Sequence, residues 1–134
     1  MKYLLDTNIC VFFFRGKYDM LNILKNKGYK NCYISEITVA ELRYGAEKSA
    51  SPTKQHALID AFLKRIHVLH LYDSILEYAR IKVQLEREGT PIHDDFDVLI
   101  GATAVHNSMT LVTDNIKHFA NFDGLTVENW IQRT

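Results

Sequence analysis

The sequence KYLLDTN, residues 2–8, places a short apolar run directly before an aspartate, Asp6. The run at residues 3–5 predicts a buried strand, because it is too short for an amphipathic helix. One interpretation makes Asp6 the N-cap of a helix that starts at Thr7, since Asp is a preferred capping residue. The other places a carboxylate at the carboxyl end of a strand, where α/β proteins bind their ligands.

The composition predicts one globular domain spanning residues 1–134. The chain is 47% hydrophobic and 24% charged, and its 16 basic and 16 acidic side chains give no net charge. This balance argues against binding nucleic acid by bulk electrostatics alone. No apolar run approaches the roughly 18 residues of a membrane span, and a strand stands where a signal peptide would be. Cys10 and Cys32 lie in apolar settings. We therefore expect reduced core cysteines in a cytoplasmic protein.

Strands alternate with helices along the chain, which predicts a parallel sheet covered by helices on both faces. Three predicted strands end on polar residues: Asp6, the pair Ser35-Glu36, and the pair Asp114-Asn115. Because the carboxyl ends of parallel strands share one edge, these groups are expected to converge there. The predicted strands cover residues 2–5, 32–35, 67–71, 110–113 and 125–129, and the predicted helices cover 7–14, 19–27, 36–48, 52–65, 73–88 and 95–107, with a helical turn at 115–120.

Two further acids occupy the apolar faces of predicted helices. In DVLIGATAVH, residues 97–106, Asp97 shares a face with Ile100, Gly101 and Ala104, and the small residues allow close packing. Glu41 is placed in the same way by its helical spacing. The residues that share a face with it are Ile37, Ala40, Tyr44 and Gly45. An ionised carboxylate on a buried face is costly unless it is paired, protonated or bound to a metal.

A divalent ion accounts for all three acids together. A salt bridge to Arg43 or Arg80 would neutralise one carboxylate, but a cluster of three at one sheet edge needs a cation. Oxygen ligands select a hard ion, Mg²⁺ or Mn²⁺. Zinc is disfavoured because the histidines are scattered, and His67 and His70 point to opposite faces of a predicted strand.

The motifs, taken in order, resemble the PIN-domain ribonucleases, and among them the VapC-type toxins of bacterial toxin–antitoxin pairs. They are LLDTN (4–8), ITVAELRYGAEKS (37–49), PIHDDFDVLIGATA (91–104) and LVTDNIKHF (111–119). The resemblance implies a three-layer α/β/α sandwich with a central, mostly parallel sheet. It also implies RNA cleavage that depends on Mg²⁺, with Mn²⁺ as an alternative ion. The implied partners are RNA, a cognate antitoxin and a second copy of the chain, with no membrane.

By position, the resemblance assigns the metal-binding and catalytic acids to Asp6, Glu41 and Asp97. The fourth acidic position of the family is Asn115 here, with Asp114 beside it, so both are candidates for the fourth site residue. In the implied mechanism, the ion polarises a phosphodiester oxygen and activates a water for in-line attack on phosphorus.

Supporting residues are expected around these acids. PIHDDFD is one residue longer than the shorter family form, so the placement of Asp94 and Asp95 is open, with Asp95 the stronger candidate for contact with the ion. Acids at a helix start are also favoured by the macrodipole alone. Thr7 and Thr113 are expected to orient waters around the ion.

Two other functions stay open from the sequence. A phosphoaspartyl enzyme would use Asp6 as a nucleophile, but haloacid-dehalogenase-like phosphatases need an aspartate where Asn8 stands, and LVTDN lacks the lysine of response-regulator receivers. A binding module without activity would keep the acids as structural residues.

The run ICVFFF at 9–14 has more aromatic residues than one core-facing stripe accepts. Either all of these side chains pack internally against the next helix, or some form an exposed surface, and we expect the second, for self-association and for an antitoxin peptide.

Overall fold

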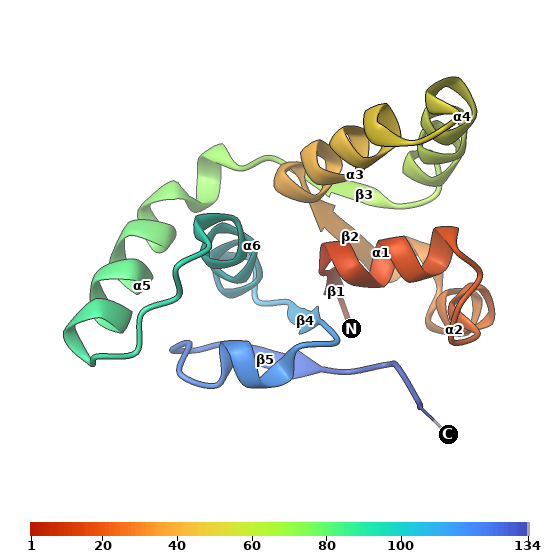
Figure 1. The fold of residues 1–134 in the computed structure, drawn as a ribbon. Helices are drawn as coiled ribbons and strands as arrows, with labels where there is room; N and C mark the ends of the chain where they lie inside the picture. Colours follow the sequence, from red (N-terminus) through yellow and green to blue (C-terminus); the bar gives the residue numbers. More distant parts are fainter. Residues whose placement is uncertain (134) are drawn as a thin grey trace.

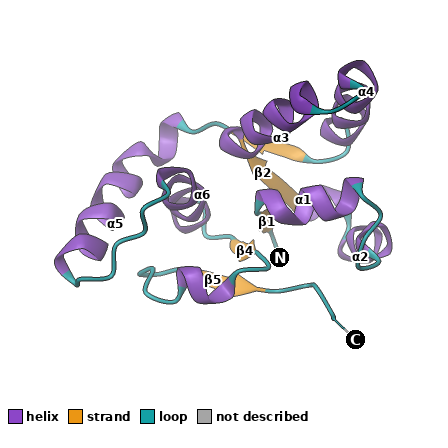
Figure 2. Cartoon of the chain, viewed as in Figure 1, coloured by secondary structure: helices purple, strands orange, loops and turns teal. Residues whose placement is uncertain are grey.

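The computed structural model describes residues 1–133 and shows a five-stranded sheet between two layers of helices (Figures 1 and 2). The strand order is β3-β2-β1-β4-β5, and every neighbouring pair is parallel. The predicted three-layer α/β fold is therefore confirmed, with a sheet that is parallel throughout the described residues. The strands are β1 (Tyr3–Leu5), β2 (Cys32–Ser35), β3 (His67–Leu69), β4 (Thr110–Val112) and β5 (Thr126–Glu128).

The helices agree with the sequence pattern except in one segment. The helix expected over 73–88 begins as a 3-10 turn and becomes α-helical at Ile75. The α-helices are α1 (Thr7–Phe14), α2 (Met20–Lys27), α3 (Glu36–Lys48), α4 (Pro52–Leu63), α5 (Ile75–Arg87) and α6 (Asp95–His106), and the 3-10 turns are η1 (Tyr29–Asn31), η2 (Tyr72–Ser74) and η3 (Ile116–Phe119). Among residues 1–133, no helix has the length and apolar character needed to cross a bilayer.

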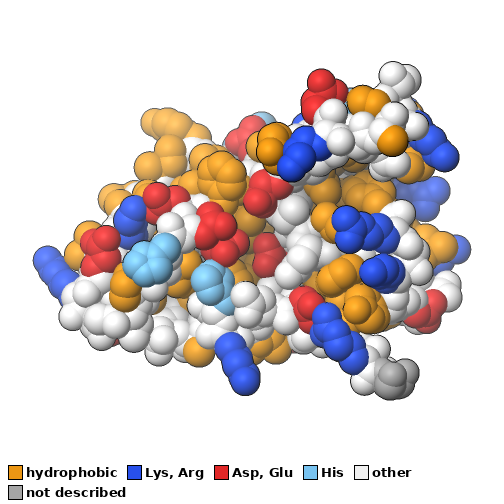
Figure 3. Space-filling model, viewed as in Figure 1, with side chains coloured by type: hydrophobic (Ala, Val, Ile, Leu, Met, Phe, Trp, Pro, Cys, Tyr) orange, Lys and Arg blue, Asp and Glu red, His pale blue; other side chains and the backbone are white. Residues whose placement is uncertain are grey.

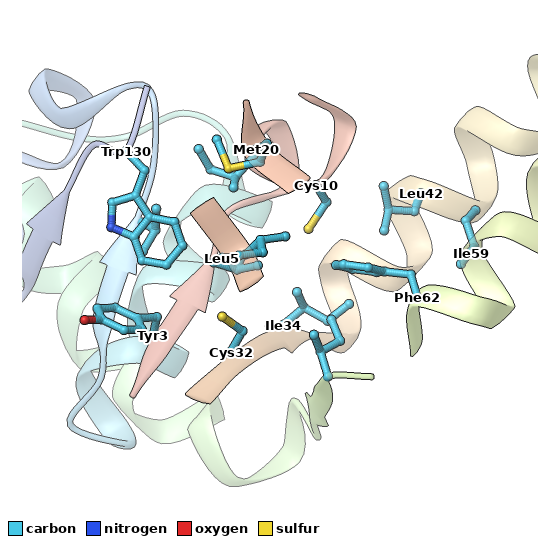
Figure 4. Close-up of a cluster of buried hydrophobic side chains, with 14 of the residues drawn as sticks. Tyr3, Leu5, Cys10, Met20, Cys32, Ile34, Leu42, Ile59, Phe62 and Trp130 are labelled. Atoms are coloured by element: carbon cyan, nitrogen blue, oxygen red, sulfur yellow. The ribbon is translucent and has the colours of Figure 1, made fainter. Parts of the chain in front are cut away.

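Side-chain alternation along β1 divides the core in two. Tyr3 and Leu5 belong to a cluster that α1, α2, α4 and part of α3 cover, and Figure 4 shows Leu5, Cys10 and Phe62 within it. Leu4 points to the other face and belongs to a cluster with α5, α6 and η3. Both cysteines are buried and free, as expected of core residues. The sheet is thus buried on both faces, as is typical of parallel sheets.

The aromatic run of α1 packs largely within the protein. The Phe12 ring lies edge-on to Tyr18 with their centroids 5.0 Å apart, and the rings of Phe13 and Phe14 lie 4.9 and 5.2 Å from that of Phe62 in α4. The α1–α2 loop and α4 therefore cover much of each ring, and a partner surface at this run stays a prediction. The three phenylalanines are half-buried.

Candidate functional site

Asp6 satisfies both interpretations of its position. It follows β1 and caps α1, where its Oδ1 accepts a hydrogen bond from the Thr7 amide at 2.8 Å. Its Oδ2 accepts a hydrogen bond at 2.8 Å from the hydroxyl of Thr113, which follows the neighbouring strand β4. Two strand ends therefore fix one buried carboxylate in place.

Glu41 is held through α1. Thr7 donates its hydroxyl to Glu41 Oε1 at 2.6 Å, so Thr7 must accept the bond that joins it to the buried hydroxyl of Thr38, 2.9 Å away. The predicted apolar stripe of α3 is wrong, because the helix is rotated. Its buried residues are Ile37, Thr38, Leu42 and Ala46, while Tyr44 is 65% exposed. Glu41 lies at the border of the buried face and is half-buried.

Asp97 lies in the first turn of α6, on a side of the helix that is buried as predicted. Ile100, Gly101 and Ala104 are all buried. A Cβ atom on Gly101 would lie 2.5 Å from Cζ of Phe122, so any side chain at this position requires the Phe122 ring to shift. Asp97 Oδ2 is 2.9 Å from Nε2 of His118 in η3. That ring nitrogen donates the bond when the carboxylate is ionised.

The three acids line one pocket of about 440 Å³, together with Asn115 and His118. Figure 3 shows acidic side chains gathered near the middle of one face, with histidines beside them. Burial raises the pKa of Asp6 and of Glu41. Burial, and then the charges of Asp6 and Asp94, raise the pKa of Asp97 to about 6, although the bond from His118 opposes this. The pocket therefore concentrates negative charge that no neighbouring cation neutralises fully.

Two of the candidate residues lie elsewhere. Asp95 does not line the pocket, because its carboxylate bonds Lys82 Nζ at 2.7 Å and the Tyr78 hydroxyl at 3.1 Å. Asp114 is held by both guanidinium nitrogens of Arg133, at 2.6 and 2.7 Å, and this contact lowers its pKa. Asn115 is therefore the member of the Asp114-Asn115 pair that reaches the pocket, and its backbone N–H donates to the Thr113 hydroxyl at 3.1 Å.

The salt bridges considered for the buried acids do not form. Arg43 pairs with Asp60 at 2.5 Å, and Arg80 pairs with Glu77 at 2.9 Å. The neighbour that Asp97 has instead is His118, which the sequence pattern did not predict. His118 lies five residues beyond Thr113 and reaches Asp97 only through tertiary packing, so no local signal identified it.

The donor set of the pocket fits a hydrated hard ion. Within the described residues, no three acidic, histidine or cysteine side chains converge closely enough to form a complete cage. Mg²⁺ does not need one, because it keeps several waters and takes only one or two carboxylates from the protein. Asn8, which also lines the pocket, buries its side-chain oxygen without a hydrogen-bond partner among residues 1–133. A water of the ion's shell would satisfy such an orphaned acceptor.

Comparison with known proteins agrees with this geometry. The family model described as "PIN domain" matches residues 3–125. A "tRNA(fMet)-specific endonuclease VapC" from Salmonella typhimurium is 34% identical over 132 residues, which cover 97% of this chain and 98% of the relative. The crystal structure of VapBC2 from Rickettsia felis, bound to a DNA fragment from its promoter, gives a TM-score of 0.89 at 34% identity, with 97% of this chain and 99% of that chain covered.

A third comparison concerns an assembly. A toxin–antitoxin complex from Klebsiella pneumoniae gives a TM-score of 0.73 at 27% identity, covering 98% of this chain and all of that chain. The fold is thus shared with these proteins over nearly the whole sequence. The chain belongs to the PIN-domain family and, within it, to the VapC ribonucleases.

Proposed function

We propose that this one-domain protein is the toxin of a toxin–antitoxin pair, an endoribonuclease that acts in the cytoplasm with Mg²⁺ or Mn²⁺. The observation that carries the proposal is the pocket itself, in which Asp6, Glu41 and Asp97 from three separate segments face one cavity with raised pKa values. Perturbed titratable groups that share a pocket are typical of an active site.

The residues of the pocket have different proposed roles, according to where they lie. Asp6, Asp97 and Glu41 would hold the ion, in part through the waters that it keeps, and the ion supplies Lewis-acid stabilisation of the phosphodiester and a more acidic water. Thr7 and Thr113 fix the carboxylates of Glu41 and Asp6, so little reorganisation is needed when the ion enters. Asn115 offers an amide at the rim of the pocket, where it can orient a water or a phosphate oxygen.

The geometry disfavours a phosphoaspartyl enzyme. Asn8 lines the pocket where a haloacid-dehalogenase-like phosphatase needs a second aspartate, and no lysine is among the described residues that line it. The ribonuclease interpretation needs only that Asp6 stay fixed and charged beside a cation.

The proposal is tested by incubating purified, antitoxin-free protein with total cellular RNA and with a tRNA(fMet) transcript, in EDTA and with Mg²⁺ or Mn²⁺. The transcript is included because the Salmonella relative is named for it. We expect cleavage only with the divalent ion. Asp97→Asn, purified in the same way, excludes a contaminating nuclease, and Asp73→Asn, an exposed acid outside the pocket, is the matched control. An absence of cleavage with Mn²⁺ would favour the inactive binding module.

The cognate antitoxin has a suitable surface beside the pocket. A hollow of about 350 Å³ between α1, α3 and α4 is lined by Val11, Phe14, Leu42, Ala46 and Ile59, among others, and shares Glu41 with the carboxylate pocket. An apolar peptide segment seated there would reach the acids. Co-expression with the cognate antitoxin should yield a stable complex, and Gly45→Arg, at an exposed lining position with open space around it, should weaken the complex while leaving cleavage intact.

A second copy of the chain is the remaining expected partner, and α5 supplies a face for the homodimer. Tyr72, Leu76 and Val83 lie at helical spacing along η2 and α5, and Leu76 is 68% exposed. Contiguous exposed apolar side chains mark interaction surfaces. Light scattering should give twice the chain mass for the wild type and the monomer mass for Leu76→Glu. A monomeric wild type would show that the face has another role.

A further inference from the structure

A second hollow adjoins the carboxylate pocket and has no part in the chemistry described above. It encloses about 620 Å³ between the loop at 90–94 and η3, and His118 belongs to the wall of both spaces. Most of the residues that line it are polar or charged: Thr90, His93, Asp94, Lys117, His118 and Asn121. A ligand that fills the carboxylate pocket and extends past His118 therefore enters a polar space.

Two cations flank the acids without ion-pair partners in the described part of the chain. Lys117 is exposed at the second hollow, and Arg15 is exposed at the carboxylate pocket. They lie over opposite faces of the sheet. Arg15 follows α1, which packs in the cluster of Leu5, whereas Lys117 belongs to η3, whose Phe119 packs in the cluster of Leu4. A chain that crosses the sheet edge at the acids would meet one cation on each side.

We propose that this second hollow is a nucleotide subsite, in which Lys117 holds the phosphate next to the cleaved bond while Arg15 holds a phosphate on the opposite side. The proposal rests on the ribonuclease function proposed above. RNA carries one phosphate per nucleotide, so a strand whose phosphodiester lies at the acids carries further phosphates past both rims. The acids repel those phosphates, and cations placed on either side offset that repulsion and fix the register of the strand.

The test measures binding apart from cleavage. In the Asp97→Asn background with EDTA, a labelled single-stranded RNA oligonucleotide is titrated at several KCl concentrations. The slope of log K against log[KCl] should become shallower by about 0.7 for Lys117→Ala and for Arg15→Ala, and by about 1.4 for the pair, the values for one and two lost phosphate contacts on a single strand. Lys117→Arg should keep the wild-type slope. Lys30→Ala is the matched control, because η1 precedes β2 and so lies at the opposite edge of the sheet.

Cleavage of the same oligonucleotide by the wild type with Mn²⁺ tests the proposed ribonuclease function separately from the nucleotide subsite that rests on it. If the wild type cleaves and Lys117→Ala keeps the wild-type slope, the subsite is overturned and the ribonuclease stands. If the wild type neither cleaves nor binds RNA, both fail. A third outcome concerns an acidic peptide. If polyglutamate displaces RNA only when Lys117 is present, and Lys117→Ala leaves the RNA salt slope unchanged, the hollow binds an acidic peptide and the nucleotide subsite is overturned. The supporting kinetic result is a raised KM at unchanged kcat for Lys117→Ala.

Discussion

Asp97 is the residue at which stability and function conflict most directly. Its carboxylate is half-buried, its pKa is raised to about 6, and the largest causes are burial and the charge of Asp6. His118 offsets this only in part. A charge that is unfavourable for folding, and that stands beside other acids, is expected where a cation completes the site.

Asp97→Asn should therefore abolish cleavage while leaving the protein folded. The amide keeps the shape of the side chain but removes the charge that attracts the ion. We expect a loss of more than about 100-fold in rate, beyond the effect of changing an outer-shell partner. In metal-free buffer the melting temperature should hold or rise, because one repelling charge is gone. Both quantities are to be measured on one preparation, with Asp73→Asn beside it.

A structural role for Asp97 predicts the reverse result. The Asp97–His118 contact would then be a stabilising pair, and its loss would lower the melting temperature. Activity would fall only in proportion to the unfolded fraction. A destabilised Asp97→Asn protein that still cuts RNA in that proportion would place the residue outside the catalytic machinery.

For single residues, the sequence predicted the acids of the pocket more reliably than the side chains that contact them. Asp6 and Asp97 could be placed in the pocket because a strand end and a small-residue helix face leave few other positions for them. The Asp97–His118 contact could not be foreseen, because it joins α6 to η3 across 21 residues and depends on tertiary packing. The sequence also left open which of Asp94 and Asp95 lies nearer the ion. The ion pair with Lys82 holds Asp95 away from the pocket.

At the scale of the elements, α6 packs more closely against its neighbours at Gly101 than α3 does at Gly45. Gly101 faces Phe122, whereas Gly45 in α3 has no atom within 4 Å of where a Cβ would lie. Alanine favours a helix over glycine by about 1 kcal/mol at either position. At Gly101 that gain is opposed by overpacking, which costs about 1–3 kcal/mol.

We therefore expect replacement of glycine by alanine to change the free energy of unfolding in opposite directions at these two positions. Gly45→Ala should stabilise the protein by about 0.5–1 kcal/mol. Gly101→Ala should destabilise it by up to about 2 kcal/mol, the overpacking cost less the helical gain. Urea denaturation followed by circular dichroism measures both. Phe122→Leu, which removes the ring atoms nearest Gly101, should reduce the cost of Gly101→Ala in a double-mutant cycle, and additive effects would contradict the clash.

The order of the elements along the chain and the parallel pairing of the strands followed from the alternation of strand and helix patterns, since parallel strands need helical crossovers. The rotation of α3 did not follow, because its pattern allows more than one apolar stripe and only packing against the sheet and α4 selects Leu42 and Ala46. The 3-10 turn η2 was missed for a similar reason. Its boundary with α5 is set by local backbone geometry and not by periodicity.

For the whole molecule, a divalent ion should raise the melting temperature. Mn²⁺ that binds the folded pocket and not the unfolded chain stabilises the protein by about 2.7 kcal/mol at a hundredfold excess over its dissociation constant. Melts in EDTA and in millimolar Mn²⁺ should therefore differ for the wild type. Asp97→Asn should show a much smaller difference. Equal midpoints for the wild type would argue strongly against an ion site formed by these acids.

The pH dependence should change sign with the ion. Asp97 has a folded pKa of about 6, above its usual value of 3.8, so the stability it contributes is present below about pH 4 and is lost as the pH rises through about 6. Asp6 and Glu41 are shifted in the same direction. Acids with lowered pKa values, such as Asp114, act oppositely but below this window. In EDTA the wild type should therefore melt higher at pH 5 than at pH 7.5.

With Mn²⁺ present, the ligands must be deprotonated, so the ion should stabilise the protein more at pH 7.5 than at pH 5. The comparison needs four melts of the wild type and four of Asp97→Asn, in which the Asn variant should show a flatter profile in EDTA and a small response to the ion. Because protonation and metal binding compete for the same carboxylates, the two effects must oppose each other. A wild-type protein whose Mn²⁺ response is equal at both pH values would show that the ion binds away from these acids.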